Sequence, residues 1–168
     1  MTDLVLDQNR AIRERLPTDP KCDHLRIYSF EGEMFFGASP EFERLLEQVQ
    51  QDLGPNSRAI ILRLRYARNP DAVCLNLLKH FIEEMKVRGI SVLLAGVREG
   101  MLKALNNIGI TELVGRDNVF LEEPKLWSST IEAINKAYTI LGSQRCSTCP
   151  EKADSSPSQN NADWHFSI

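Results

Sequence analysis

The spacing of apolar residues changes along the chain between a pattern typical of strands and a pattern typical of helices. Short segments that alternate or are continuously apolar predict strands. Longer segments with apolar residues every three or four positions predict amphipathic helices. The expected strands are 25–30, 33–38, 59–64, 90–95 and 118–121. The expected helices are 39–53, 72–88, 100–108 and 124–141. This order predicts an α/β protein with a mixed sheet of about five strands, mostly parallel, and about four helices.

Residues that begin and end helices support these boundaries. Ser39 and Asp71 stand where an N-cap residue is expected, and Pro40 is suited to the first helical position. Gly89 and Gly109 follow helical segments, where a left-handed residue commonly ends a helix.

The strand order predicts how the sheet is assembled. We expect the segments 25–30 and 33–38, separated by a Glu31-Gly32 turn, to form an antiparallel pair at one edge. The later strands alternate with helices, so we expect them to be parallel.

Three regions of different character divide the chain. Residues 1–24 form an N-terminal lead-in with two prolines, which we expect to dock as a short helix or strand. Residues 25–142 carry the periodic pattern and form the folded domain. Residues 143–168 are rich in Ser, Gln, Asn and charge, so we expect a disordered tail.

Length and charge narrow the function classes. A chain of 168 residues fits one domain with tails, and a net charge of -3 is not that of a general nucleic-acid binder. Arg63, Arg65 and Arg68 form a local basic cluster, but we expect Arg63 and Arg65 to face solvent on an alternating strand. The sequence has no apolar run long enough to span a bilayer and no signal peptide, which predicts a cytosolic setting.

Candidate chemical groups do not combine into a catalytic or metal site. Cys146 and Cys149 form one CxxC, half of what a zinc site needs. Cys74, at a predicted helix start, is either a thiol with lowered pKa or a small buried apolar residue. His24 and His80 have no partner at a spacing that indicates a catalytic triad. We therefore expect no enzyme activity, no metal and no cofactor.

An ordered set of segments carries a family resemblance. It comprises residues 27–30, 32–37, 59–64, Asp71, 89–96, 105–115 and 117–120. Together they resemble a STAS domain, and more narrowly the cytoplasmic C-terminal STAS domain of SulP-type anion transporters.

This resemblance implies a regulatory and assembly role through protein contact. The partners it implies are the transmembrane domain of the same transporter, at the cytoplasmic face of the membrane, and a second copy in a homodimer. The transported anion would be of the sulfate or bicarbonate kind. Candidate contact residues are Met34, Phe35 and Phe36, although the same apolar segment suits a core strand.

The turn at residues 69–74 departs from one branch of the family. Relatives of the anti-sigma-factor-antagonist type carry a phosphorylatable hydroxyl there, after an Asp. Here the residues are Asn69, Pro70, Asp71, Ala72, Val73 and Cys74. Neither Ala72 nor Val73 can accept phosphate, so we expect a degenerate regulatory loop in which Asp71 caps the helix.

Two alternative functions remain open from the sequence. One is a stand-alone partner-switching protein of the anti-sigma-antagonist type. The other is a nucleotide-binding α/β module that uses the turns near residues 70–74 and 96–100, at the carboxyl ends of strands.

Overall fold

A single mixed sheet organises the molecule. The computed structural model describes residues 1–7 and 11–143, and among them the sheet has six strands in the order β2-β1-β3-β4-β5-β6. The strands are β1 (Thr2–Leu6), β2 (Ile12–Glu14), β3 (Leu25–Glu33), β4 (Ala59–Arg68), β5 (Ser91–Val97) and β6 (Val119–Leu121). The expected α/β class with a mostly parallel sheet is confirmed, with six strands in place of about five.

Four parallel strands form the centre of the sheet. β3 pairs with β4, β4 with β5, and β5 with β6, all in parallel, and Ile61 stands opposite Leu93 in the register. Both of these residues are completely buried. Helices cover both faces of these strands, which explains why their sequences are nearly continuous apolar runs.

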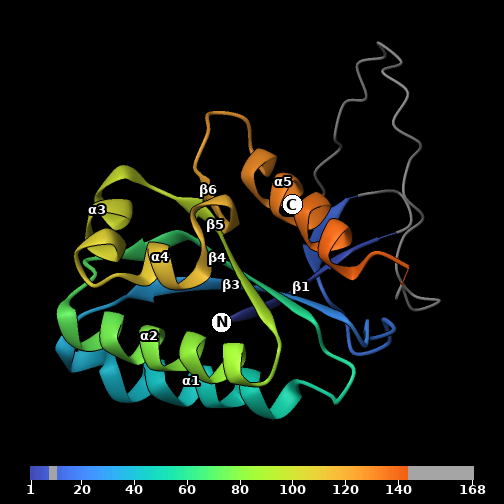
Figure 1. The fold of residues 1–168 in the computed structure, drawn as a ribbon, viewed down its shortest axis with the longest axis horizontal. Helices are drawn as coiled ribbons and strands as arrows, with labels where there is room; N and C mark the ends of the chain where they lie inside the picture. Colours follow the sequence, from blue (N-terminus) through green and yellow to red (C-terminus); the bar gives the residue numbers. More distant parts are fainter. Residues whose placement is uncertain (8–10, 144–168) are drawn as a thin grey trace.

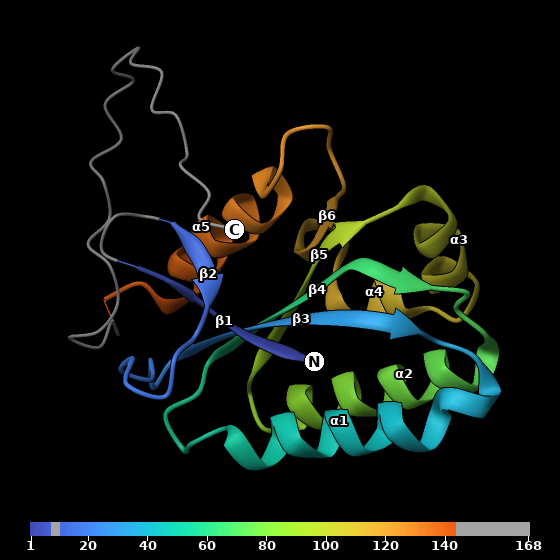
Figure 2. The same cartoon turned by 180° about the vertical axis from the view of Figure 1, so that it is seen from behind.

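The helices lie in two layers of unequal size (Figures 1 and 2). One face packs against α1 (Ser39–Asp52), α2 (Ala72–Val87), α3 (Glu99–Asn107) and α4 (Ile110–Val114). The opposite face packs against α5 (Ser128–Leu141), with Ile134 and Ala137 buried in the contact. Two short 3-10 turns, Phe36–Ala38 and Arg116–Asn118, complete the described elements.

The expected antiparallel pairing of 25–30 with 33–38 is wrong. β3 continues through Glu31 and Gly32 because these residues, after a register shift between Ser29 and Glu31, resume the parallel ladder with Tyr66 and Ala67 of β4. The chain then turns at Phe36–Ala38 instead of forming a second strand. Longer pairing with a buried central strand outweighs the local turn preference of Glu-Gly.

The antiparallel part of the sheet comes from the N-terminal segment. β1 pairs with β2 and, on its other side, with β3, both antiparallel. Leu4 is buried where β1 lies beside Ile27. Residues of the lead-in therefore form part of the same sheet as the later strands.

Helix boundaries differ locally from those expected. Ala38, not Ser39, is the N-cap of α1, and the Ser39 hydroxyl donates to the Phe36 carbonyl at 2.7 Å. The last helix begins at Ser128 rather than Pro124, after Trp127 in a left-handed conformation. α4 is an additional helix that the sequence pattern did not predict.

Arg63 is buried, which corrects its expected exposure to solvent. Only 2 % of the residue is exposed, because α5 and the chain before it cover this face of β4 as well. Arg65 is partly buried and pairs with Glu122.

Two further expectations concern the membrane and the tail. Within the described part of the chain, no helix has both the length and the apolar character needed to cross a bilayer. The predicted disorder of the tail from residue 144 onward and the Cys146/Cys149 pair lie outside the described residues.

Candidate protein-contact site

Two loops at the carboxyl ends of β3 and β4 lie against each other. The Met34 amide donates to the Arg68 carbonyl at 2.8 Å, and the Asp71 amide donates to the Met34 carbonyl at 2.8 Å. The Cys74 thiol lies 3.4 Å from the Phe35 carbonyl. The structure thus brings together the two sets of candidate residues, 34–36 and 69–74, that the sequence named separately.

Asp71 caps α2, as its sequence position predicts. Its Oδ1 atom accepts from the amides of Val73 and Cys74, at 3.0 Å each, and its backbone is extended. These bonds satisfy two of the free N–H groups that every helix start exposes. Asp71 therefore has a structural role that needs no phosphate on its neighbours.

Asn69 shapes the entry to this turn. It has a φ of 48°, a left-handed conformation that Asn tolerates better than most residues. Its side-chain amide donates to Glu33 Oε2 at 2.7 Å, which ties the β4–α2 loop to the end of β3. Pro70 follows and restricts the backbone before the helix.

Cys74 is a buried core residue and not an activated thiol. Its exposed fraction is 0 %, and burial raises the pKa of the thiol above its ordinary value, with Asp71 acting in the same direction. Of the two readings of Cys74, the small buried residue is therefore the one the structure supports.

Three exposed apolar side chains gather on the surface of these loops. Phe36 is 72 % exposed, Phe35 49 % and Val73 41 %, and we call these three residues the apolar patch. Met34 is completely buried in the core, so it contributes packing rather than surface. The Phe35 ring lies over Gly37, where an added Cβ would stand 2.6 Å from Cε2.

The apolar patch carries no phosphate acceptor at the positions after Asp71. Ala72 and Val73 are both exposed, and neither has a hydroxyl. The chemistry available here is burial of apolar area against another protein surface, since exposed apolar side chains on adjoining loops can form an interaction site.

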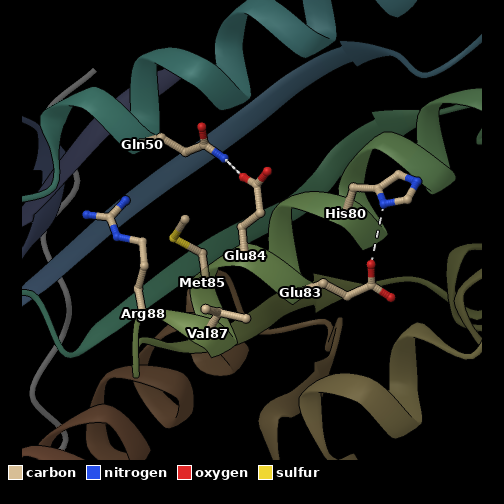
Figure 3. Close-up of a pocket in the computed structure, with 7 residues that line it drawn as sticks. All are labelled: Gln50, His80, Glu83, Glu84, Met85, Val87 and Arg88. Atoms are coloured by element: carbon tan, nitrogen blue, oxygen red, sulfur yellow. Dashed lines mark hydrogen bonds and ion pairs between the residues drawn. The ribbon is translucent and has the colours of Figure 1, made fainter.

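A shallow hollow lies at the other end of the same helices. It has a volume of about 530 Å³ and is lined by the C-terminal half of α2, by Arg88 after it and by Gln50 of α1 (Figure 3). Gln50 pairs with Glu84 there, and His80 Nδ1 lies 3.3 Å from Glu83 Oε2. Across residues 1–7 and 11–143, no cluster of His, Cys, Asp and Glu is arranged to hold a metal ion.

Sequence reasoning missed two features, the exposure of Val73 in this site and the burial of Arg63 elsewhere in the sheet. Val73 joins the apolar patch because the turn geometry directs it outward, although it begins an apolar helix. Arg63 is a cation inside a strand buried on both faces, and its position between Leu62 and Leu64 was the available signal.

Comparison with known proteins defines the family. The STAS domain family model matches residues 16–126, about two thirds of the chain. The chain belongs to the STAS domain family. No curated protein sequence matches it significantly.

Solved structures agree with this assignment. A sulfate transporter family protein from Wolinella succinogenes is 28 % identical, with a TM-score of 0.56 over 70 % of this chain and 87 % of its own. The STAS domain of a SulP transporter from Vibrio cholerae is 26 % identical, with a TM-score of 0.52 over 76 % and 88 %.

A more distant structure shares the fold alone. The murine Solute Carrier 26 family member A9 anion transporter is 16 % identical, with a TM-score of 0.58 over 70 % of this chain and 18 % of that chain. The fold and family are thus those of STAS domains, and the similar structures include domains of SulP transporters.

Proposed function

We propose that this chain is the cytoplasmic regulatory and assembly domain of a SulP-type anion transporter and acts by protein contact, without catalysis. The observation that carries the proposal is the apolar patch, where Phe35, Phe36 and Val73 lie exposed on two loops held together by backbone hydrogen bonds. An exposed apolar surface suits burial against a protein partner.

The sequence of the turn supports a contact that does not depend on phosphorylation there. A phosphate at a helix start acts by adding charge that changes partner binding. Ala72 and Val73 cannot carry it, and Asp71 already occupies the cap. This distinguishes the proposed role from that of a stand-alone partner switch controlled at the same turn.

The two most similar structures named above support the transporter setting. Both carry transporter names and match most of their own length. The partners we propose are a transmembrane domain of the same transporter and a second copy of this domain. The proposed cargo is an anion of the sulfate or bicarbonate kind, at the cytoplasmic face of the membrane.

Molar mass in solution tests whether the apolar patch joins two copies. We expect the parent chain to form a dimer in light scattering after size exclusion, and Phe36→Ser to shift it toward monomer. Val87→Ser is the matched control, since Val87 is 90 % exposed beside the hollow of Figure 3 and away from the patch. A dimer that Phe36→Ser leaves intact would remove the patch from self-association.

The gene itself tests the transporter setting. The reading frame upstream of Met1 should encode several apolar segments of about 20 residues each, the length that spans a bilayer. In that longer protein, a photoreactive residue at position 36 should crosslink to the transmembrane part or to a second STAS domain. An upstream frame without such segments would refute the transporter assignment.

A further inference from the structure

Arg63 occupies an unusual place for a charged side chain. It lies in the middle of β4, on the face that α5 covers, and only 2 % of the residue is exposed. Its guanidinium carbon is 4.1 Å from the centre of the Trp127 ring and 5.2 Å from that of the Tyr66 ring. The cation is thus enclosed mainly by aromatic rings.

The hydrogen bonds of Arg63 are incomplete. Nη1 reaches Ser29 Oγ at 3.5 Å, the long end of the hydrogen-bond range, and Tyr66 is a further side-chain hydrogen-bond partner of the guanidinium. Nε has no partner among the described residues. Burial lowers the pKa of Arg63, but a guanidinium remains protonated at neutral pH. A charged donor is therefore held in the protein interior with an unused N–H.

The charges around Arg63 do not balance. Arg65 lies two residues along the same strand and pairs with Glu122. The charge of Glu122 also acts on Arg63, so these two arginines and one carboxylate, counted among the described residues, carry one net positive charge. The N-terminus of α5 follows Trp127 directly, and the positive end of that helix adds to the same potential.

Three more donors of this region are buried without a partner in the described part of the chain. They are Arg65 Nε, Trp127 Nε1 and Thr130 Oγ1. Thr130 comes three residues after Trp127, so both belong to the start of α5. Each of these groups carries hydrogen that an oxygen atom of an anion accepts.

We propose that Arg63 anchors a binding site for a small oxyanion, at the carboxyl half of β4 beneath Tyr66 and Trp127. The planar Nε edge of the guanidinium matches two oxygen atoms of such an anion. Trp127, whose ring lies beside the guanidinium and whose Nε1–H has no partner among the described residues, and the positive end of α5 add to the surroundings. The inference stands on these side chains and does not depend on the proposed transporter role.

An anion can reach Arg63 only if a side chain that covers it moves. Tyr66 contacts the guanidinium and is itself 37 % exposed, so Arg63 lies directly beneath the surface. Trp127 has a φ of 70°, a left-handed conformation that is strained for a bulky residue. Rotation of Tyr66, or relaxation of the turn at Trp127, exposes the guanidinium.

Sulfate is a suitable probe, with two independent readouts. In a Trp164→Phe background, Trp127 is the remaining tryptophan and reports on Arg63 directly. Replacing chloride with sulfate at constant ionic strength should change Trp127 fluorescence saturably. It should also shift the nitrogen and proton resonances of the Arg63 Nε–H group with the same midpoint.

Substitutions assign the effect to Arg63. Arg63→Met keeps an elongated apolar side chain against the rings and should weaken sulfate binding at least tenfold, while Arg44→Met, at an exposed arginine on α1, should leave it unchanged. Circular dichroism checks that Arg63→Met is folded. If that variant does not fold, the Arg63 resonance of the parent decides the question.

Three results would overturn the proposal. The first is a linear, non-saturating response to sulfate. The second is an Arg63 Nε–H resonance that does not move during the titration. The third is a folded Arg63→Met variant that binds sulfate as the parent does.

Discussion

Asp71 shows how one side chain sets the shape of a loop. Its carboxylate caps α2 through the amides of Val73 and Cys74, while Ala72 and Val73 offer no hydroxyl. The turn is thus capped by a carboxylate, and the two positions after Asp71 offer no site for phosphorylation. At the scale of the residue, this loop is a fixed support for the apolar patch.

Replacing Asp71 with alanine tests the cap. We expect Asp71→Ala to lower the free energy of unfolding by about 1 kcal/mol, because two amides lose their acceptor. Urea denaturation followed by circular dichroism measures the change. Asp71→Asn, whose side-chain oxygen still accepts, should recover most of the loss; equal destabilisation by both variants would contradict a capping role.

Charged side chains fasten the N-terminal hairpin of β1 and β2 to the rest of the sheet. Arg26, which is 5 % exposed, contacts both Asp3 of β1 and Asp52 at the end of α1. Arg15 reaches Asp3 at 2.5 Å, and Lys21 reaches Asp52 at 2.5 Å. The hairpin is therefore held by ion pairs as well as by the packing of Leu4.

The pH dependence of stability should reveal this network through Asp52. Burial alone would raise its pKa, but hydrogen bonds from Lys21 and Tyr28 and the charge of Arg26 outweigh burial and lower the pKa below the ordinary 3.8. The stabilisation is thus present above pH 3.8 and is lost as the pH falls through the lowered value.

Urea midpoints measured from pH 2 to pH 7 test this expectation. Asp52→Asn should be less stable than the parent at pH 7, and the difference between the two should shrink as the pH falls below 3.8. A difference that stays constant over the whole range would show that the charge of Asp52 does not stabilise the fold.

Gly96 allows the end of β5 to approach the Arg65–Glu122 pair. Its φ is 68°, and an added Cβ would stand 3.0 Å from Glu122 Oε2 and 3.1 Å from Arg65 Cβ. The register of β5 and β6 is irregular between Leu94 and Val97, which marks the same place. A glycine here lets β5 bend beside a partly buried ion pair.

Gly96→Ala should therefore destabilise the protein by about 2 kcal/mol, from left-handed strain and the close contacts. Gly100→Ala is the matched control, because Gly100 lies in α3 with open space around its Cα and alanine favours the helix. Thermal unfolding should show a lower midpoint for the first variant and an equal or higher one for the second. The reverse order would contradict the assigned role of Gly96.

The hydrophobic core is larger on one face of the sheet than on the other. Four helices cover one face, and α5 covers the other with a smaller set of buried residues (Figure 2). The smaller face also contains Arg63 and its unused donors. Regions with less apolar burial open at lower free energy than the central core.

The rates of amide hydrogen exchange should differ between the two faces of the sheet. We expect the slowest exchange in β4 and β5, at the free energy of global unfolding, and faster exchange together in α5 and the β1–β2 hairpin. Such a partial opening would also provide a route to Arg63. Equal protection of α5 and β4 would show that the two layers unfold as one unit.

The sequence predicted the elements better than their pairing. The apolar runs at 59–64 and 90–95 became β4 and β5, and Asp71 became a cap, because local periodicity and capping chemistry act within a few residues. Segment 33–38 failed as a strand because the partner of β3 is β4, a choice made by distant residues. Residues 34–36 and 69–74 stay candidate contact residues, and only the tertiary structure decided that Met34 is buried and that Val73 is exposed.

The sequence by itself determined the α/β class, the order of the central elements, the STAS resemblance and the absence of a hydroxyl after Asp71, since each of these is written in local pattern or residue identity. Only the tertiary structure decided which strands pair, that β1 and β2 extend the sheet, which phenylalanines face solvent, and that Arg63 is enclosed by Tyr66 and Trp127. The physical reason is that burial and strand pairing depend on residues far apart in the chain, and a strand pattern alone does not say what will cover each of its faces.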